Sequence, residues 1–188
     1  MTKNTILASS ALTAIGLYLY VFLLLDSADP IKSWVNASAI LALCYFLITF
    51  AASSVNYLVA NQFTHSLLRN RRYFGLGFAI TQTFHLISFT YLYLVTEEQL
   101  DVLTVIGGGL AYVLLYGMVA TSNAQMIKKL GTRRWKNLHS TGMHYFALIF
   151  LVTFVLRFID SNYSLTYGVY ALLIVLVYVM RLLKKKRL

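Results

Sequence analysis

The chain has 188 residues, of which 59% are hydrophobic and 12% are charged. A water-soluble domain has about twice this share of charged residues, so the composition excludes an ordinary soluble domain and indicates an integral membrane protein. The net charge is +10. An excess of lysines and arginines on one side of a membrane accounts for this charge, so we expect no nucleic-acid partner.

Apolar runs of about 20 residues, long enough to cross the hydrocarbon core as a helix, occur six times along the chain. They cover residues 5–25, 36–60, 73–96, 102–122, 138–159 and 163–182, approximately. The first run follows Lys3 like a signal peptide, but it continues to Leu25, so we expect a membrane helix. Short segments join the runs. The sequence thus predicts an all-α fold, a single transmembrane domain over 1–188 with six helices in one bundle.

The charged residues separate onto two sides of this expected bundle. Fourteen of the 16 lysines and arginines fall on the side that holds both ends of the chain. The other side receives Lys32, Arg157 and all six acidic residues: Asp26, Asp29, Glu97, Glu98, Asp101 and Asp160. By the positive-inside rule, both termini are predicted to be cytoplasmic. The basic side also predicts contact with anionic membrane lipids.

Two further features carry little chemistry. Cys44 is the only cysteine, so an intramolecular disulfide is excluded and we expect it to pack as a small apolar residue. The glycine run at 107–109 lies within an expected span and lets a neighbouring helix or a flat cofactor approach the backbone.

The four histidines are His65, His85, His139 and His144. Counting from Arg72, the helical rise places His85 roughly 20 Å into the membrane, near its middle. His139 and His144 lie near the start of the fifth span, and their spacing makes them point in different directions, so they cannot both face one flat ligand. His65 lies at the cytoplasmic end of the second span, near the level of His139.

Histidines within a membrane act as interhelical hydrogen-bond partners, proton relays, or ligands to a metal or haem. For one histidine alone, a structural role is favoured. The set favours a cofactor, because His85 and His139 lie on two spans that run in the same direction. No acidic residue falls deep within a span, which argues against a carboxylate-based transporter.

Two motifs resemble a known family. The stretch RRYFGL at 71–76 with FHL at 84–86, and RWKNLH at 134–139 with Gly142 and Tyr145, are similar to helices three and five of the ferric-reductase-like transmembrane superfamily. The version in MsrQ, the haem-binding membrane subunit of periplasmic methionine sulfoxide reductase systems, is especially similar. The resemblance covers residues 36–182, approximately.

The resemblance implies a b-type haem protein of the bacterial inner membrane that relays electrons across the bilayer, as an electron-transfer subunit of an oxidoreductase. Members with two stacked haems hold each haem by one histidine from helix three and one from helix five. Carried onto this chain, His85 and His139 would bind haem iron. Arg71, Arg72 and Arg134 would pair with haem propionates; their plainer role is to set topology and bind lipid phosphate.

The chain departs from the two-haem pattern at both partner positions. The partner expected for His85 falls at Val152, and the one expected for His139 falls at Arg71, so one or two haems b would have incomplete ligation. Three alternatives stay open: His85 and His144 share a tilted haem, His65 and His139 hold one near the cytoplasmic side, or a haem is five-coordinate or absent.

The implied partners are an electron donor and an acceptor. The residues carry no nicotinamide or flavin motif, so electrons would come from a quinol or from a separate cytosolic flavin reductase that docks on the basic side. Quinone or flavin is therefore a further expected cofactor, and the recipient is an extracytoplasmic redox partner. The competing hypothesis is a haem-free membrane scaffold or accessory subunit that keeps the same bundle.

Overall fold

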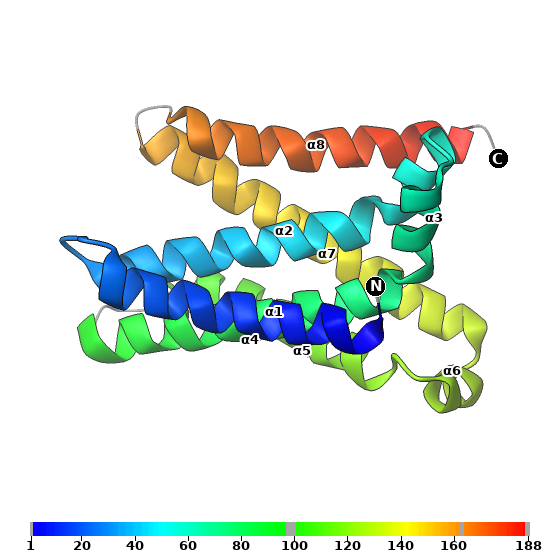
Figure 1. Ribbon diagram of the computed structural model, residues 1–188, viewed down its shortest axis with the longest axis horizontal. Coiled ribbons are helices and arrows are strands. Elements are labelled where there is room, and N and C mark those ends of the chain that lie inside the picture. The colour runs from blue at the N-terminus through cyan, green and yellow to red at the C-terminus, as the bar shows by residue number, and fades with distance from the viewer. Residues whose placement is uncertain (1, 97–100, 162–163, 187–188) are drawn as a thin grey trace. The chain divides into compact units, whose positions relative to one another are not determined.

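The computed structural model describes residues 2–96, 101–161 and 164–186, and every element within them is a helix (Figure 1). The helices are α1 (Lys3–Leu19), the π-helical turn η1 (Tyr20–Leu24), α2 (Pro30–Leu58), α3 (Gln62–Arg69), α4 (Arg71–Thr96), α5 (Val102–Ala120), α6 (Ala124–Leu130), α7 (Thr132–Asp160) and α8 (Leu165–Lys186). This confirms the all-α prediction. Glu97, Glu98 and the expected start of the last span at 163 lie outside the described residues.

Among the described residues, five helical segments are long and apolar enough to cross a membrane: Lys3–Leu24, Pro30–Leu58, Arg71–Thr96, Thr132–Asp160 and Leu165–Lys184. A sixth candidate arises only when α5 and α6 are taken together, as a pair bent by 108°. Many large apolar side chains on these helices face outward; Leu12 is 67% exposed and Val113 is 70% exposed. Exposed apolar surface of this kind marks a membrane or protein contact, and together with the candidate spans it agrees with an integral membrane protein.

Two long helices begin earlier than hydropathy predicts. α2 starts at Pro30, where the Asp29 carboxylate accepts a hydrogen bond from the Lys32 backbone N–H at 3.0 Å, and a proline in the first turn has the backbone angle a helix needs. α7 starts at Thr132, and its first turns are polar. Hydropathy locates the apolar part of a helix but not its ends. The polar first turns of α2 and α7 therefore lay outside the predicted spans.

Two short helices, α3 and α6, occupy segments that we expected to be plain connections. Each follows an asparagine N-cap: the Asn61 side chain accepts from the Thr64 backbone N–H at 2.9 Å, and Asn123 accepts from Met126 N–H at 2.8 Å. Caps of this kind satisfy the unpaired donors of a first turn. These short helices were recognisable from Asn followed by a mixed apolar and basic stretch.

The chain forms two compact units, and each is described by itself. The first unit comprises 1–52 and 61–101, and the second comprises 53–60 and 102–188. In the first unit α1 packs on α4 at Gly77, where an added Cβ would lie 3.3 Å from Ser10 Cβ of α1 and 3.1 Å from the Tyr45 ring of α2. Its core contains stacked and edge-on phenylalanines, Phe46, Phe50 and Phe78, with neighbouring ring centroids 5.1 and 5.5 Å apart. The single-domain expectation for 1–188 stays a prediction.

In the second unit α7 packs against both α5 and α8. The contact with α5 is closest at Gly142, where an added Cβ would lie 2.6 Å from the Met118 sulfur. The contact with α8 includes buried Phe154, whose ring meets that of Tyr170 edge-on at 5.2 Å. The end of α2 belongs to this unit through Ser53, whose carbonyl accepts from Lys184 Nζ at 3.4 Å.

Candidate functional site

His85 lies on α4 within a small polar cluster that includes a residue of α2. Its Nδ1 is 3.0 Å from Ser38 Oγ, and Ser38 Oγ is 2.9 Å from Ser88 Oγ. Ser88 Oγ also donates to the His85 carbonyl at 2.9 Å. Both serines are buried, with exposed fractions of 2% and 0%. The cluster therefore bonds α4 to α2 inside the first unit and orients the imidazole.

The Ser38 hydroxyl has one proton and three neighbours that can accept it: the Val35 carbonyl at 2.9 Å, His85 Nδ1 and Ser88 Oγ. In the arrangement in which the Val35 carbonyl takes this proton, Nδ1–H of His85 donates to Ser38 Oγ, and Nε2 is the ring nitrogen that would bind a metal. Histidines that bind metals have this arrangement, in which an acceptor holds the N–H of the other ring nitrogen.

His144 on α7 has the same arrangement with a different partner. Its Nδ1 lies 2.7 Å from the Ser140 carbonyl one turn earlier. A carbonyl can only accept, so Nδ1 carries the proton and Nε2 carries the lone pair. The ring meets Tyr178 of α8 edge-on, with centroids 5.7 Å apart. His144 therefore also fits the chemistry of an iron ligand.

His139 has the opposite arrangement. Its Nε2 is 3.2 Å from Thr121 Oγ1, and that hydroxyl lies 2.8 Å from the Gly117 carbonyl, to which it donates. With the hydroxyl proton given to Gly117, His139 Nε2–H is the donor in this contact. Trp135 supports the contact: its ring centroid is 4.5 Å from the imidazole, and its Nε1–H donates to the Thr121 carbonyl at 3.1 Å. An iron-binding role for His139 would require the Thr121 contact to open.

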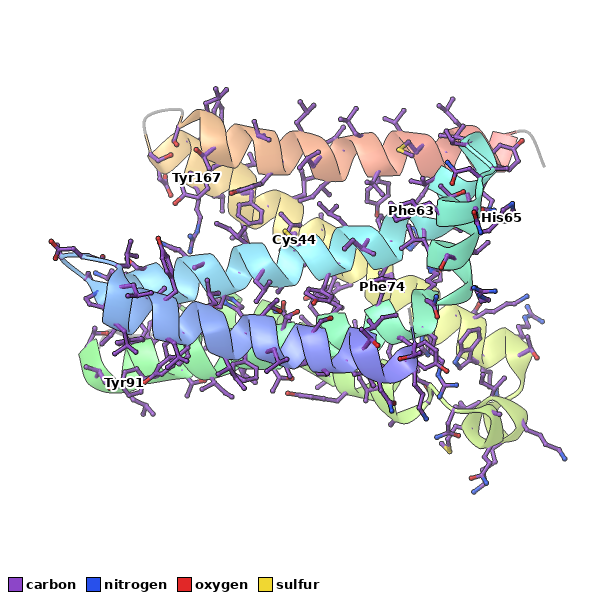
Figure 2. The ribbon with its side chains drawn as sticks, in the orientation of Figure 1. Cys44, Phe63, His65, Phe74, Tyr91 and Tyr167 are labelled. Atoms are coloured by element: carbon purple, nitrogen blue, oxygen red, sulfur yellow. The ribbon has the colours of Figure 1, made fainter. Side chains whose placement is uncertain are left out.

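His65 lies on α3, which runs across the direction of α2 and α4 in the first unit, and Figure 2 shows its side chain on that helix beside Phe63. The His65 side chain is exposed. His65 and His85 belong to the first unit, and His139 and His144 to the second. Each of the two expected histidine pairs takes one member from each unit, so both pairings stay predictions.

The three arginines of the resemblance have different surroundings. Arg71 Nε donates to the Thr49 carbonyl of α2 at 2.9 Å, so it bonds the start of α4 to α2. Arg72 is exposed, with its guanidinium carbon 5.9 Å from the Tyr73 ring centroid. Arg134 is exposed on the first turn of α7. Arg72 and Arg134 have the exposure that binding a phosphate or carboxylate group requires.

Within the glycine run at 107–109, a neighbouring helix approaches the backbone closely at Gly107 alone. Tyr145 of α7, which belongs to the second motif, donates through its hydroxyl to the Gly107 carbonyl at 2.9 Å. An added Cβ at Gly108 or Gly109 would have no atom within 4 Å. The run therefore admits a neighbouring side chain at Gly107 alone.

Sequence reasoning missed the groups that orient the imidazoles, which are Ser38, Ser88, Thr121 and the Ser140 carbonyl. The spacing of Ser88 from His85 places them on one helical face, but Ser38 and Thr121 come from other helices and had no sequence signal. Within 2–96, 101–161 and 164–186, no three or more His, Cys, Asp or Glu side chains gather as a metal site. A haem needs only one or two protein ligands, so this finding does not bear on haem.

Comparisons with protein-family models, with curated proteins and with solved structures found no match to this chain. The relation to the ferric-reductase-like superfamily therefore stays a prediction that rests on the two motifs.

Proposed function

We propose that the protein is a membrane-bound b-type haem protein that relays electrons across the bilayer. The observation that carries this proposal is the 3.0 Å contact between His85 Nδ1 and Ser38 Oγ. If Nδ1–H donates in this contact, the mid-span imidazole would bind iron through Nε2, which is the arrangement of a histidine ligand. The resemblance of the sequence motif around His85 to the haem-binding family is the second support for this proposal.

In this proposal His85 is the iron ligand, while Ser38 and Ser88 are positioning residues that hold its ring. His144 is a second candidate ligand, with its own Nδ1–H held by the Ser140 carbonyl. Arg72 and Arg134 supply exposed guanidinium groups for the propionates. A bound haem supplies a one-electron redox couple.

We further propose that the chain is a subunit and not a complete enzyme. Its donor would be a quinol or a cytosolic flavin reductase, and its acceptor an extracytoplasmic redox partner. The bacterial inner membrane with both termini cytoplasmic is the proposed location, supported by the fourteen cations on one side against two on the other.

Haem content is the test of this function. Protein purified in mild detergent is converted to the pyridine haemochrome, and haem is compared with protein on a molar basis. We expect about one haem per chain, or fewer than two in any case, because two partner positions are Val152 and Arg71. The absorption bands should shift on reduction by dithionite. Two low-spin haems per chain would contradict the assigned ligands.

The alternative function is a haem-free scaffold or accessory subunit, and one observation favours it. The cluster of Ser38, His85 and Ser88 bonds α4 to α2 through protein groups alone. Such a cluster is a sufficient reason for a histidine within a membrane. Under this alternative the purified protein is colourless, and His85→Ala lowers stability without any spectral change.

A further inference from the structure

The segment from Asn123 to Lys136, which we call the basic elbow, carries a cluster of positive charge. It comprises α6, Gly131 and the first turns of α7. Five exposed cations lie within it: Lys128, Lys129, Arg133, Arg134 and Lys136. Between Val102 and Ile159 the sequence contains no Asp or Glu. The charge of the elbow is therefore not neutralised by any neighbour in sequence.

The direction of α6 places the elbow along a membrane surface. α6 is bent by 108° from α5, so where α5 crosses the membrane, α6 runs close to the membrane plane. Its ends are well defined: Asn123 caps the start, and the backbone N–H of Gly131 donates to the Ile127 carbonyl at 3.0 Å. Gly131 has φ +79°, a conformation suited to glycine, and there the chain turns into α7.

The side chains of α6 divide between an inner and an outer face. Met126, Ile127 and Leu130 are half-buried, and α6 packs on α7, whereas Lys128 and Lys129 are exposed. This is the pattern of a helix that lies in a membrane interface with its cations at the level of the phosphates.

The elbow is also held in place from α5. Trp135 donates through Nε1–H to the carbonyl of Thr121, and His139 contacts the Thr121 hydroxyl. Both bonds join the start of α7 to the end of α5. The cations are therefore presented on a positioned backbone and not on a free loop, which lowers the entropy lost when they bind a ligand.

We propose that the basic elbow binds the headgroups of anionic phospholipids in the adjacent leaflet. Guanidinium groups bind phosphate through two parallel hydrogen bonds, and each cation near an anionic surface adds to the attraction. The run of α6 along the membrane favours lipid over an acidic protein as the occupant. The elbow shares Arg134 with the proposed propionate contacts, so the variants below change Lys128 and Lys129, which have no part in the proposed haem site.

Lipid quenching of Trp135 fluorescence tests the proposal. The chain has two tryptophans, and Trp34→Phe leaves Trp135 inside the elbow as the only reporter. This protein is placed in phosphatidylcholine vesicles that contain a minor share of brominated phosphatidylglycerol or, in parallel, brominated phosphatidylcholine. We expect stronger quenching by the anionic lipid, and weaker preference at high salt.

Two charge-matched variants make the test specific. Lys128→Gln with Lys129→Gln should lower the preference for phosphatidylglycerol by roughly fivefold for each cation removed. Lys3→Gln with Arg69→Gln removes two exposed cations outside the elbow and should leave the preference unchanged. Unquenched Trp135 emission in both variants reports whether the elbow is intact.

Three results would overturn the proposal. The first is equal quenching by both brominated lipids in the protein with the unaltered elbow. The second is an equal preference for phosphatidylglycerol in the two variants. The third is relief of the quenching by poly-L-glutamate, the probe for an acidic protein, at a charge concentration equal to that of the lipid.

Discussion

At the scale of single residues, each membrane imidazole has a hydroxyl or carbonyl neighbour at one defined ring nitrogen. At His85 and His144 this neighbour lies at Nδ1. At His139 it lies at Nε2. Sequence alone could not distinguish these arrangements, because Ser38 and Thr121 lie far in the chain from the histidines that they contact.

Ser38→Ala removes the acceptor at His85 Nδ1 and should lower haem affinity by about 10- to 100-fold, the usual effect of losing the partner that orients a ligand. Titration of haem into the haem-free protein measures this. Ser140→Ala is the matched control, because His144 is held by the Ser140 carbonyl, which the substitution keeps. Equal affinities in the wild type and Ser38→Ala would show that Ser38 does not position a ligand.

Thr121→Val removes the hydroxyl that meets His139 and keeps the carbonyl that accepts from Trp135. We expect a loss of about 1 kcal/mol in the free energy of unfolding, as for one hydrogen bond between neutral groups, with haem content unchanged. Thermal or denaturant unfolding in detergent, followed by haem quantification, gives both values. A gain of haem in Thr121→Val would contradict this expectation and show that the Thr121 contact keeps His139 from the iron.

At the scale of elements, hydropathy located the apolar centres of the helices but not their ends or the short helices between them. The core of α4 over 73–96 was predicted almost to its bounds, because its polar start is only two arginines. α7 was predicted from 138 and begins at Thr132, since its first turns carry Arg133, Arg134 and Lys136. The bend between α5 and α6 had no apolar signature at all.

Gly142 is a position where α7 closely approaches a side chain of α5. Gly142→Ala would place a Cβ 2.6 Å from the Met118 sulfur, so the flexible Met118 side chain must move, and we expect a cost of about 1 kcal/mol, at the low end for overpacking. Gly109→Ala has no atom within 4 Å of its new Cβ and should be close to neutral. Adding Met118→Ala to Gly142→Ala should recover part of the loss in unfolding experiments. An equal cost at Gly109 and Gly142 would contradict this packing.

At the scale of the whole molecule, the distribution of charge between the two expected sides comes from residue counts in the sequence and stays a prediction. Fourteen cations lie on one expected side, and two cations with six acids lie on the other. The arrangement of the histidines was the least predictable, because it depends on which helices meet and where their hydroxyls lie. Orientation in the membrane is therefore a prediction that charge alone supports.

The two ends of α7 provide a matched pair for testing orientation. Thr132 and Ser161 are both exposed and uncharged, and replacing Cys44 by Ser removes the native thiol. In intact cells an impermeant maleimide should label Ser161→Cys, and it should label Thr132→Cys only after permeabilisation. The reverse pattern would invert the topology and place both termini outside.

The central claim is that His85 binds haem iron, and its loss is the most direct test. Haem per protein is measured by pyridine haemochrome in wild type, His85→Ala and His65→Ala, the last being an exposed histidine of the same unit. We expect His85→Ala to lose the haem spectrum or shift it strongly while the helices stay inserted, and His65→Ala to match the wild type. Full wild-type absorbance in His85→Ala would contradict the claim and leave His85 as a helix-packing donor.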